Sequence, residues 1–219
     1  MRASVVLVTC LACLLPVGAV PGYAQVAKLY PVDQAARHPS FLAFRTRLLR
    51  AVRARDTTYV LSMVAPNIRN TLGNHGGPAE FRAQWQLASG GERLWSTLRE
   101  VLERGGTFLG DTMFTAPYTS AAWPAGLDAF EHYVVVARGV RVRSQPATTA
   151  QVLAVLSYDI VRSTDGHPSE PAPGWTAVVL ADGRRGYVIS RSVTSPIGYR
   201  AAFARRRNRW YLVSLLAGD

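Results

Sequence analysis

The chain has 219 residues and a formal net charge of +11, with 25 Lys and Arg against 14 Asp and Glu. Its two cysteines, Cys10 and Cys13, both lie in the first apolar segment. Once that segment is removed, no cysteine remains for a disulfide, a thiolate zinc site or a thiol nucleophile. The positive charge suits anionic partners, but the arginines are scattered and no nucleic-acid motif is present, so we expect no nucleic acid as a partner.

Residues 1–24 are typical of a signal peptide, with Arg2 before an apolar run over residues 5–20. The Gly-Tyr-Ala sequence that follows permits cleavage after Ala24. The run is too short for a stable membrane anchor. We therefore expect an exported protein that is periplasmic or secreted. Lipidation at Cys13 is the alternative to cleavage after Ala24.

A helical domain is predicted over residues 38–105. Ser40 is a suitable N-cap for a first helix, whose apolar residues recur at helical spacing. Asp56 can cap a second helix that ends at Pro66, and Pro78 suits the first turn of a third helix. A fourth amphipathic helix completes the domain.

Two further segments flank this helical domain. Residues 25–37 are polar and contain proline, which predicts a loose lead-in. Residues 106–130 hold Phe108, Phe114 and Trp123 among Gly, Thr, Ala and Pro, without a clean period. We interpret the second segment as an ordered, aromatic-rich connector that packs against one of its neighbours, because loose linkers lack such residues.

Residues 131–219 consist of short β-branched and aromatic runs separated by turn residues, the pattern of a small β-barrel. Two last runs, on either side of a basic turn from Arg205 to Arg209, predict a C-terminal hairpin. We expect its first strand to close the barrel and its second to extend the same sheet. The predicted fold is α+β, a helical domain followed by a small barrel with an additional hairpin.

Three motifs lie in this region: Val142-Arg143-Ser144-x-Pro146, Trp175-x-x-Val178 and Gly183-Arg-Arg-Gly186-Tyr187-Val188. With them the pattern resembles the bacterial SH3-like (SH3b) domain over about residues 133–193. That resemblance implies a recognition module rather than an enzyme. Three positions depart from the usual pattern: Arg141 stands in place of Asn, Gln145 in place of Gly, and Tyr187, conservatively, in place of Trp.

A second resemblance concerns the two ends of the chain. The helical sequence from Leu48 to Asp56, and the closing hairpin with Trp210, are similar to parts of ketosteroid-isomerase-like cone folds. The middle of the chain does not fit, since an SH3-like segment stands where the sheet of that fold is expected. By this analogy Asp56 would be a general base, whereas the helix pattern makes it an N-cap.

The candidate ligand groove lies on the predicted barrel. Strand alternation directs Val140 and Val142 inward and the neighbouring arginines outward. Outward arginines beside aromatic rings suit carboxylates of a peptide, while the alternative is a solvated strand with the rings in the core. The groove candidates are Tyr133, Arg141, Arg143, Tyr158, Trp175 and Tyr187.

No catalytic or metal site is predicted, and we expect no cofactor. The four histidines show no ligand spacing, no carboxylates are paired as a glycosidase requires, and no serine-hydrolase motif is present. We therefore expect a non-catalytic protein that binds a cell-envelope component, either a peptidoglycan peptide or a protein partner. The alternatives are a cone-fold or envelope-hydrolase enzyme and a structural assembly protein.

Overall fold

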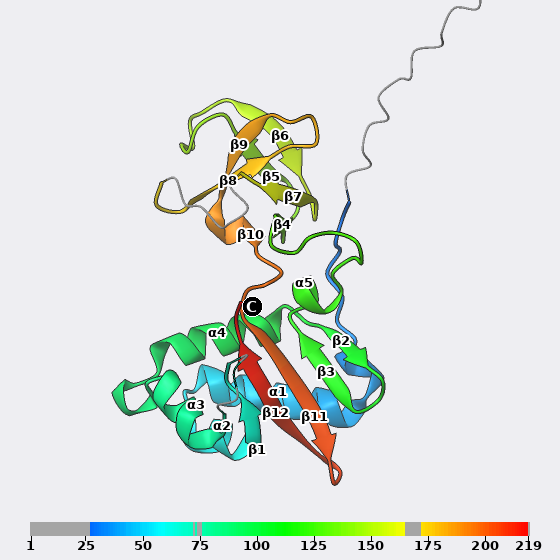
Figure 1. Ribbon diagram of the computed structural model, residues 1–219, viewed down its shortest axis with the longest axis vertical. Coiled ribbons are helices and arrows are strands. Elements are labelled where there is room, and N and C mark those ends of the chain that lie inside the picture. Colours follow the sequence, from blue (N-terminus) through cyan, green and yellow to red (C-terminus); the bar gives the residue numbers. More distant parts are fainter. Residues whose placement is uncertain (1–26, 72, 74–75, 165–171, 219) are drawn as a thin grey trace, which may run out of the picture.

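The computed structural model describes residues 27–71, 73, 76–164 and 172–218, which form two lobes (Figure 1). The first lobe combines helices with one sheet, and the second lobe is built on another sheet. The predicted signal peptide, its cleavage after Ala24 and Cys13 lie outside the described residues. Within the described part, no helix combines the length and the apolar character needed to span a membrane.

The four predicted helices are present in the first lobe. Asp56 caps the second helix, because its side chain accepts a hydrogen bond from the Tyr59 amide at 2.9 Å. The prediction for Ser40 was wrong: the first helix begins at Pro39 after His38, and Ser40 Oγ instead accepts a bond from Trp210 Nε1. The elements are η1 (Ala35–Arg37), α1 (Pro39–Arg53), α2 (Thr57–Met63), α3 (Pro78–Gln84), η2 (Leu87–Ser89) and α4 (Glu92–Glu103).

The sheet of the first lobe has five strands, in the order β1-β12-β11-β3-β2. The predicted C-terminal hairpin is confirmed as β11 and β12, but its predicted place in the second sheet was wrong. It pairs with β3 on one side and with β1 on the other. The strands are β1 (Val64–Arg69), β2 (Thr107–Leu109), β3 (Met113–Ala116), β11 (Arg200–Arg206) and β12 (Arg209–Leu216).

Three strands in this sheet, β1, β2 and β3, were not predicted as strands. The segment 106–130, interpreted as a connector, supplies β2 and β3 and then α5 (Tyr118–Ala121). Pro66, predicted to end a helix, lies inside β1. A proline is tolerated there because β1 is an edge strand that pairs with β12 alone.

The helices pack on one face of this sheet around a core of aromatic rings. Phe41 is fully buried, and its ring centroid lies 4.2 Å from that of Phe114 and 4.9 Å from that of Trp210. Phe203 and Leu212 are equally buried beside them. This packing fills the space between helices and sheet, so the first lobe has a solid interior.

The second sheet has seven strands in the order β10-β4-β7-β8-β9-β5-β6. The order is open, with β10 and β6 at its edges, so the described strands do not form the closed barrel that we predicted. Val142, Val178 and Val188 are fully buried in its core, which confirms the predicted inward direction of Val142. The elements are β4 (His132–Val135), β5 (Val140–Arg143), β6 (Val152–Leu156), β7 (Ile160–Ser163), β8 (Trp175–Val179), β9 (Arg185–Ile189), η3 (Ser190–Ser192) and β10 (Val193–Thr194).

The second lobe is an insertion within the first. Ala116 at the end of β3 is paired with Ala201 on β11, although more than eighty positions separate them in the sequence. All strands of the second sheet lie between these two residues. The chain therefore leaves the first sheet after β3, forms the second lobe and returns to the neighbouring strand (Figure 1).

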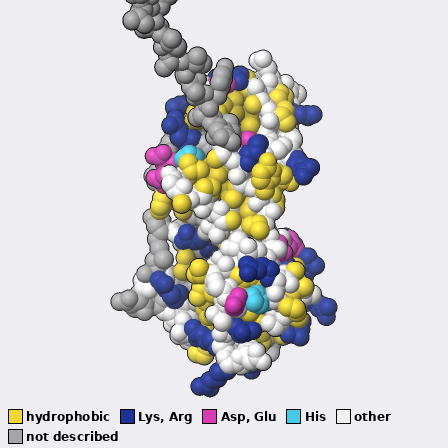
Figure 2. Space-filling model, turned by 90° about the vertical axis from the view of Figure 1, so that its right-hand side faces the viewer, with side chains coloured by type: hydrophobic (Ala, Val, Ile, Leu, Met, Phe, Trp, Pro, Cys, Tyr) yellow, Lys and Arg dark blue, Asp and Glu magenta, His cyan; other side chains and the backbone are white. Residues whose placement is uncertain are grey.

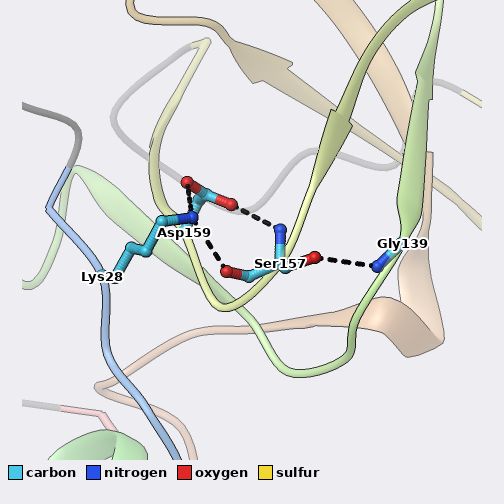
Figure 3. Close-up of polar contacts among 4 residues, drawn as sticks. All are labelled: Lys28, Gly139, Ser157 and Asp159. Carbon is cyan, nitrogen blue, oxygen red and sulfur yellow. Dashed lines mark hydrogen bonds and ion pairs between the residues drawn. The ribbon is translucent and has the colours of Figure 1, made fainter.

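The start of the described chain ties the lobes together. Lys28 Nζ lies 2.7 Å from Asp159 Oδ1 and donates to the Ser157 carbonyl at 3.0 Å (Figure 3). Leu29 is buried with Tyr118, Val134 and Ile160 in a small cluster at the junction. Further along the segment, a bidentate pair joins Asp33 to Arg45 of α1. The segment predicted as a loose lead-in is thus an ordered strap across both lobes.

Candidate functional site

Four of the six groove candidates share one face of the second sheet. Arg143 is paired with Tyr187, which is in turn paired with Ala177, and Trp175 is paired with Ile189. Directly paired residues of antiparallel strands point to the same side, as do residues two apart on one strand. Arg141, Arg143, Trp175 and Tyr187 therefore lie together on the face opposite the buried valines.

Exposure distinguishes this face from the core. Arg141 is exposed, while Arg143, Trp175 and Tyr187 are half-buried. Trp175 and Tyr187 belong to none of the buried clusters, so their rings are placed for contact beyond the core. Aromatic rings held on a sheet expose a flat apolar surface with little loss of side-chain entropy on binding.

Two further arginines extend the same face. Arg162 on β7 and Arg185 on β9 are both paired with Val179, and both are exposed. We name the six residues Arg141, Arg143, Arg162, Trp175, Arg185 and Tyr187 the arginine–aromatic face. Alternation along β9 could have revealed Arg185 from the sequence, since it stands two positions before Tyr187.

The arginines of this face are not neutralised by any acid in the part of the chain that the structure describes. Arg141, Arg162 and Arg185 form no ion pair within the described residues. The Arg143 guanidinium donates to the Ala150 carbonyl at 2.6 Å, which fixes its direction without balancing its charge. A face with this excess of guanidinium groups favours anionic ligands, and carboxylates in particular because of their bidentate geometry.

Asp182 lies in the turn between β8 and β9, close to the arginine–aromatic face. Hydrogen bonds from Arg184, together with its charge, lower the pKa of the Asp182 carboxyl below its usual value. The same pair raises the pKa of Arg184. The partner of Asp182 is therefore Arg184, within the same turn, and not an arginine of the arginine–aromatic face.

Tyr133 is separated from the other candidates. It is 5 % exposed and packs in the core of the second lobe with Val135 and Val161. The expectation that it lines the groove was therefore wrong. The sequence signal was misleading because β4 is buried on both sides, with Val134 facing the junction between the lobes.

Tyr158 also lies apart from this face, in the turn before β7. Its φ of 62° places it in the left-handed region. Its ring centroid lies 5.6 Å from that of Tyr30, and the Arg138 guanidinium lies 5.8 Å from it. Tyr158 therefore contacts the N-terminal strap and does not belong to the arginine–aromatic face, contrary to our prediction.

Two open hollows of the described structure have no pair of catalytic groups in their lining. A groove of about 430 Å³ runs between α1 and α4, where Arg53 and Glu103 form an ion pair at 2.8 Å. A smaller hollow of about 220 Å³ lies at the junction of the lobes, beside Arg104 and Tyr199. In the described part of the chain, no three His, Cys, Asp or Glu side chains are grouped closely enough to hold a metal ion.

Comparisons of the chain with protein-family models, curated proteins and solved structures gave no significant match. The function is therefore inferred from the geometry of the arginine–aromatic face and its surroundings.

Proposed function

We propose that this chain is an exported, non-catalytic binding protein that recognises a carboxylate-bearing component of the cell envelope. Its ligand is a peptidoglycan peptide or a protein partner. The second lobe is the binding module, an SH3-like domain inserted into an α+β domain. The helices and C-terminal hairpin that resemble a cone fold belong to the host domain, which is the first lobe.

The observation that carries the proposal is the arginine–aromatic face. Its guanidinium groups offer paired donors to carboxylates, and the rings of Trp175 and Tyr187 offer apolar area beside them. A peptide that carries free carboxyl groups has both features. The open surface suits an extended chain rather than a small molecule enclosed in a cavity.

The enzyme alternative has less support. A cone-fold enzyme needs a pocket between its helices and its sheet, and in this chain Phe41, Phe114 and Phe203 fill that space. Asp56, the residue that the analogy would make a base, caps α2 at the surface. Asp159 is the only buried carboxylate in the described residues, and its partner is Lys28.

The test is retention on purified sacculi at moderate salt, with the chain from residue 25 onward. We expect the wild-type chain to be retained. Arg141→Gln with Arg185→Gln should reduce retention roughly tenfold, which corresponds to about 1.4 kcal/mol. The matched control is Arg47→Gln with Arg99→Gln, since both arginines are exposed on helices of the first lobe and form no ion pair within the described residues.

If the folded wild-type chain is not retained, the cell-wall version of the proposal is wrong. If both double variants lose retention equally, net charge alone causes the binding and the arginine–aromatic face has no specific role. Circular dichroism of each variant would establish that the fold is intact.

A further inference from the structure

The tip of the β11–β12 hairpin carries charge in an unfavourable local arrangement. Arg207 and Asn208 have φ values of 45° and 65°, as a two-residue turn of type I′ requires. Asn accepts this conformation readily, whereas the longer side chain of Arg is uncommon there. Arg206 and Arg209 are directly paired across the strands, and like charges in that position repel. The stability of the hairpin therefore does not explain the arginines at its end. Their presence points to a role in contact with a binding partner.

The four arginines of this hairpin end, Arg205, Arg206, Arg207 and Arg209, are named the arginine tip. None of them forms an ion pair within the described residues. The Arg206 guanidinium donates to Asn67 Oδ1 at 2.6 Å, which orients it without neutralising it. The adjoining turn carries one carboxylate, Asp111, and its Oδ1 lies 3.5 Å from His38 Nε2.

An apolar row lies beside the arginine tip, on the same face of the sheet as the Arg206–Arg209 pair. Leu109, Met113, Ala204 and Tyr211 are consecutive partners across β2, β3, β11 and β12. This is the face away from the helices, because the preceding row, with Phe114 and Phe203, is the buried one. Leu109 is 68 % exposed, and the Arg209 guanidinium lies 5.7 Å from the Tyr211 ring.

We propose that the arginine tip and the Leu109 row dock on an anionic phospholipid surface. Guanidinium groups pair with lipid phosphates, and a row that has an exposed Leu at one end and a Tyr at the other is suited to the boundary between headgroups and acyl chains. The hairpin projects from the end of the first lobe that is remote from the second lobe (Figure 1). This shape fits a flat surface rather than a cleft.

Charge complementarity selects this partner over a second copy of the chain. The net charge of +11 makes two copies repel each other, whereas a phosphate-rich surface attracts the chain. Lys and Arg side chains are spread around the first lobe and occur at its lower end in the view of Figure 2. Docking through the arginine tip would leave the arginine–aromatic face of the second lobe free to bind its own ligand.

The test is co-sedimentation of the chain from residue 25 onward with vesicles, because the apolar leader would bind lipid by itself. Vesicles of phosphatidylcholine with phosphatidylglycerol are compared with vesicles of phosphatidylcholine alone. We expect binding to the anionic vesicles only. Arg206→Gln with Arg209→Gln should weaken it roughly 30-fold, at about fivefold for each arginine. Arg47→Gln with Arg99→Gln is the control of equal charge loss and should retain most of the binding.

Leu109→Ser tests the apolar row separately. Leu109 is largely exposed, so this change should leave the fold intact and weaken vesicle binding several-fold. The proposal is overturned if neither vesicle binds, if both double variants weaken binding equally, or if Leu109→Ser has no effect. It is also overturned if poly-glutamate binds the arginine tip as tightly as the anionic vesicles do, since an acidic protein would then be the better partner.

Discussion

At the scale of single residues, the junction between the lobes contains a buried polar group that has no hydrogen-bond partner within the described residues. The Tyr118 side chain is 3 % exposed, and its hydroxyl has no hydrogen-bond partner within the described residues. Burial raises the pKa of the Tyr118 phenol above its ordinary value of 10.0, while the nearby charge of Arg104 acts in the opposite direction. Burial thus favours the neutral phenol in the folded state.

Tyr118→Phe is expected to leave stability unchanged at neutral pH or to raise it by about 0.5–1 kcal/mol, because an unpaired buried hydroxyl is removed. In the wild-type chain the neutral phenol contributes to the free energy of unfolding. This contribution is fully present below pH 10 and is lost as the pH rises through the raised pKa of Tyr118. The variant should therefore lose less stability at alkaline pH. Thermal unfolding across this range, with Tyr59→Phe as control, would detect the difference, and a strongly destabilised Tyr118→Phe would contradict it.

The ion pair between Lys28 and Asp159 joins the N-terminal strap to the second lobe. Asp159 is 4 % exposed, so loss of the Lys28 ammonium would leave a buried carboxylate without its charged partner. Lys28→Met should lower the free energy of unfolding by about 1–3 kcal/mol, while Lys28→Arg should retain most of it. Urea unfolding measures the free energy of unfolding of both variants. Equal stability of Lys28→Met and wild type would show that the strap does not depend on this ion pair.

The sequence was informative about residue direction only where the alternation was regular. Along β5 it predicted Val140 and Val142 inward and Arg141 outward, as the structure has them. Tyr133 and Tyr158 broke the rule for physical reasons. Tyr133 lies on a strand that is covered on both sides, and Tyr158 lies in a turn with positive φ, so neither obeys a simple in-and-out pattern.

At the scale of elements, the close pairing of β5 and β9 depends on a single glycine. A Cβ at Gly186 would lie 2.4 Å from Val142 Cγ1, which is closer than any packed side chain allows. Gly186→Ala should therefore cost about 1–3 kcal/mol through overpacking. It should also weaken ligand binding, since Arg143 and Tyr187 are direct partners where these two strands pair.

Urea unfolding and sacculus retention measure the two effects of Gly186→Ala. Gly183→Asn is the control, because Gly183 has a φ of 84° and open space around it, and Asn tolerates that conformation. If Gly186→Ala is as stable as the control, the close approach of β5 and β9 is not a constraint on the sheet.

The long helices and the hairpin could be predicted because their periods extend over many residues. The strands β2 and β3 could not, since they have only three and four residues, and β3 pairs with β11, far away in the sequence, while β2 pairs with β3. The hairpin was assigned to the wrong sheet for the same reason. Local pattern predicted its turn, but nothing local indicated which strand it would join.

At the scale of the whole molecule, the insertion predicts that the first lobe folds without the second. The buried core of the first lobe draws on residues 35–116 and 201–215 only. A chain that starts at Asp33, with residues 118–198 replaced by a short Gly-Ser linker, should therefore unfold cooperatively. Circular dichroism during heating would measure this. A gradual, non-cooperative transition would indicate that the lobes depend on each other for folding.

The central claim, that the arginine–aromatic face binds an envelope peptide, is tested most directly by residue-resolved NMR. Soluble peptidoglycan fragments that carry their peptide carboxylates are titrated into the labelled chain from residue 25 onward. We predict saturable shift changes at Arg141, Trp175, Arg185 and Tyr187, with the helices α1 to α4 unaffected. No change at saturating fragment, or changes confined to the first lobe, would contradict the account.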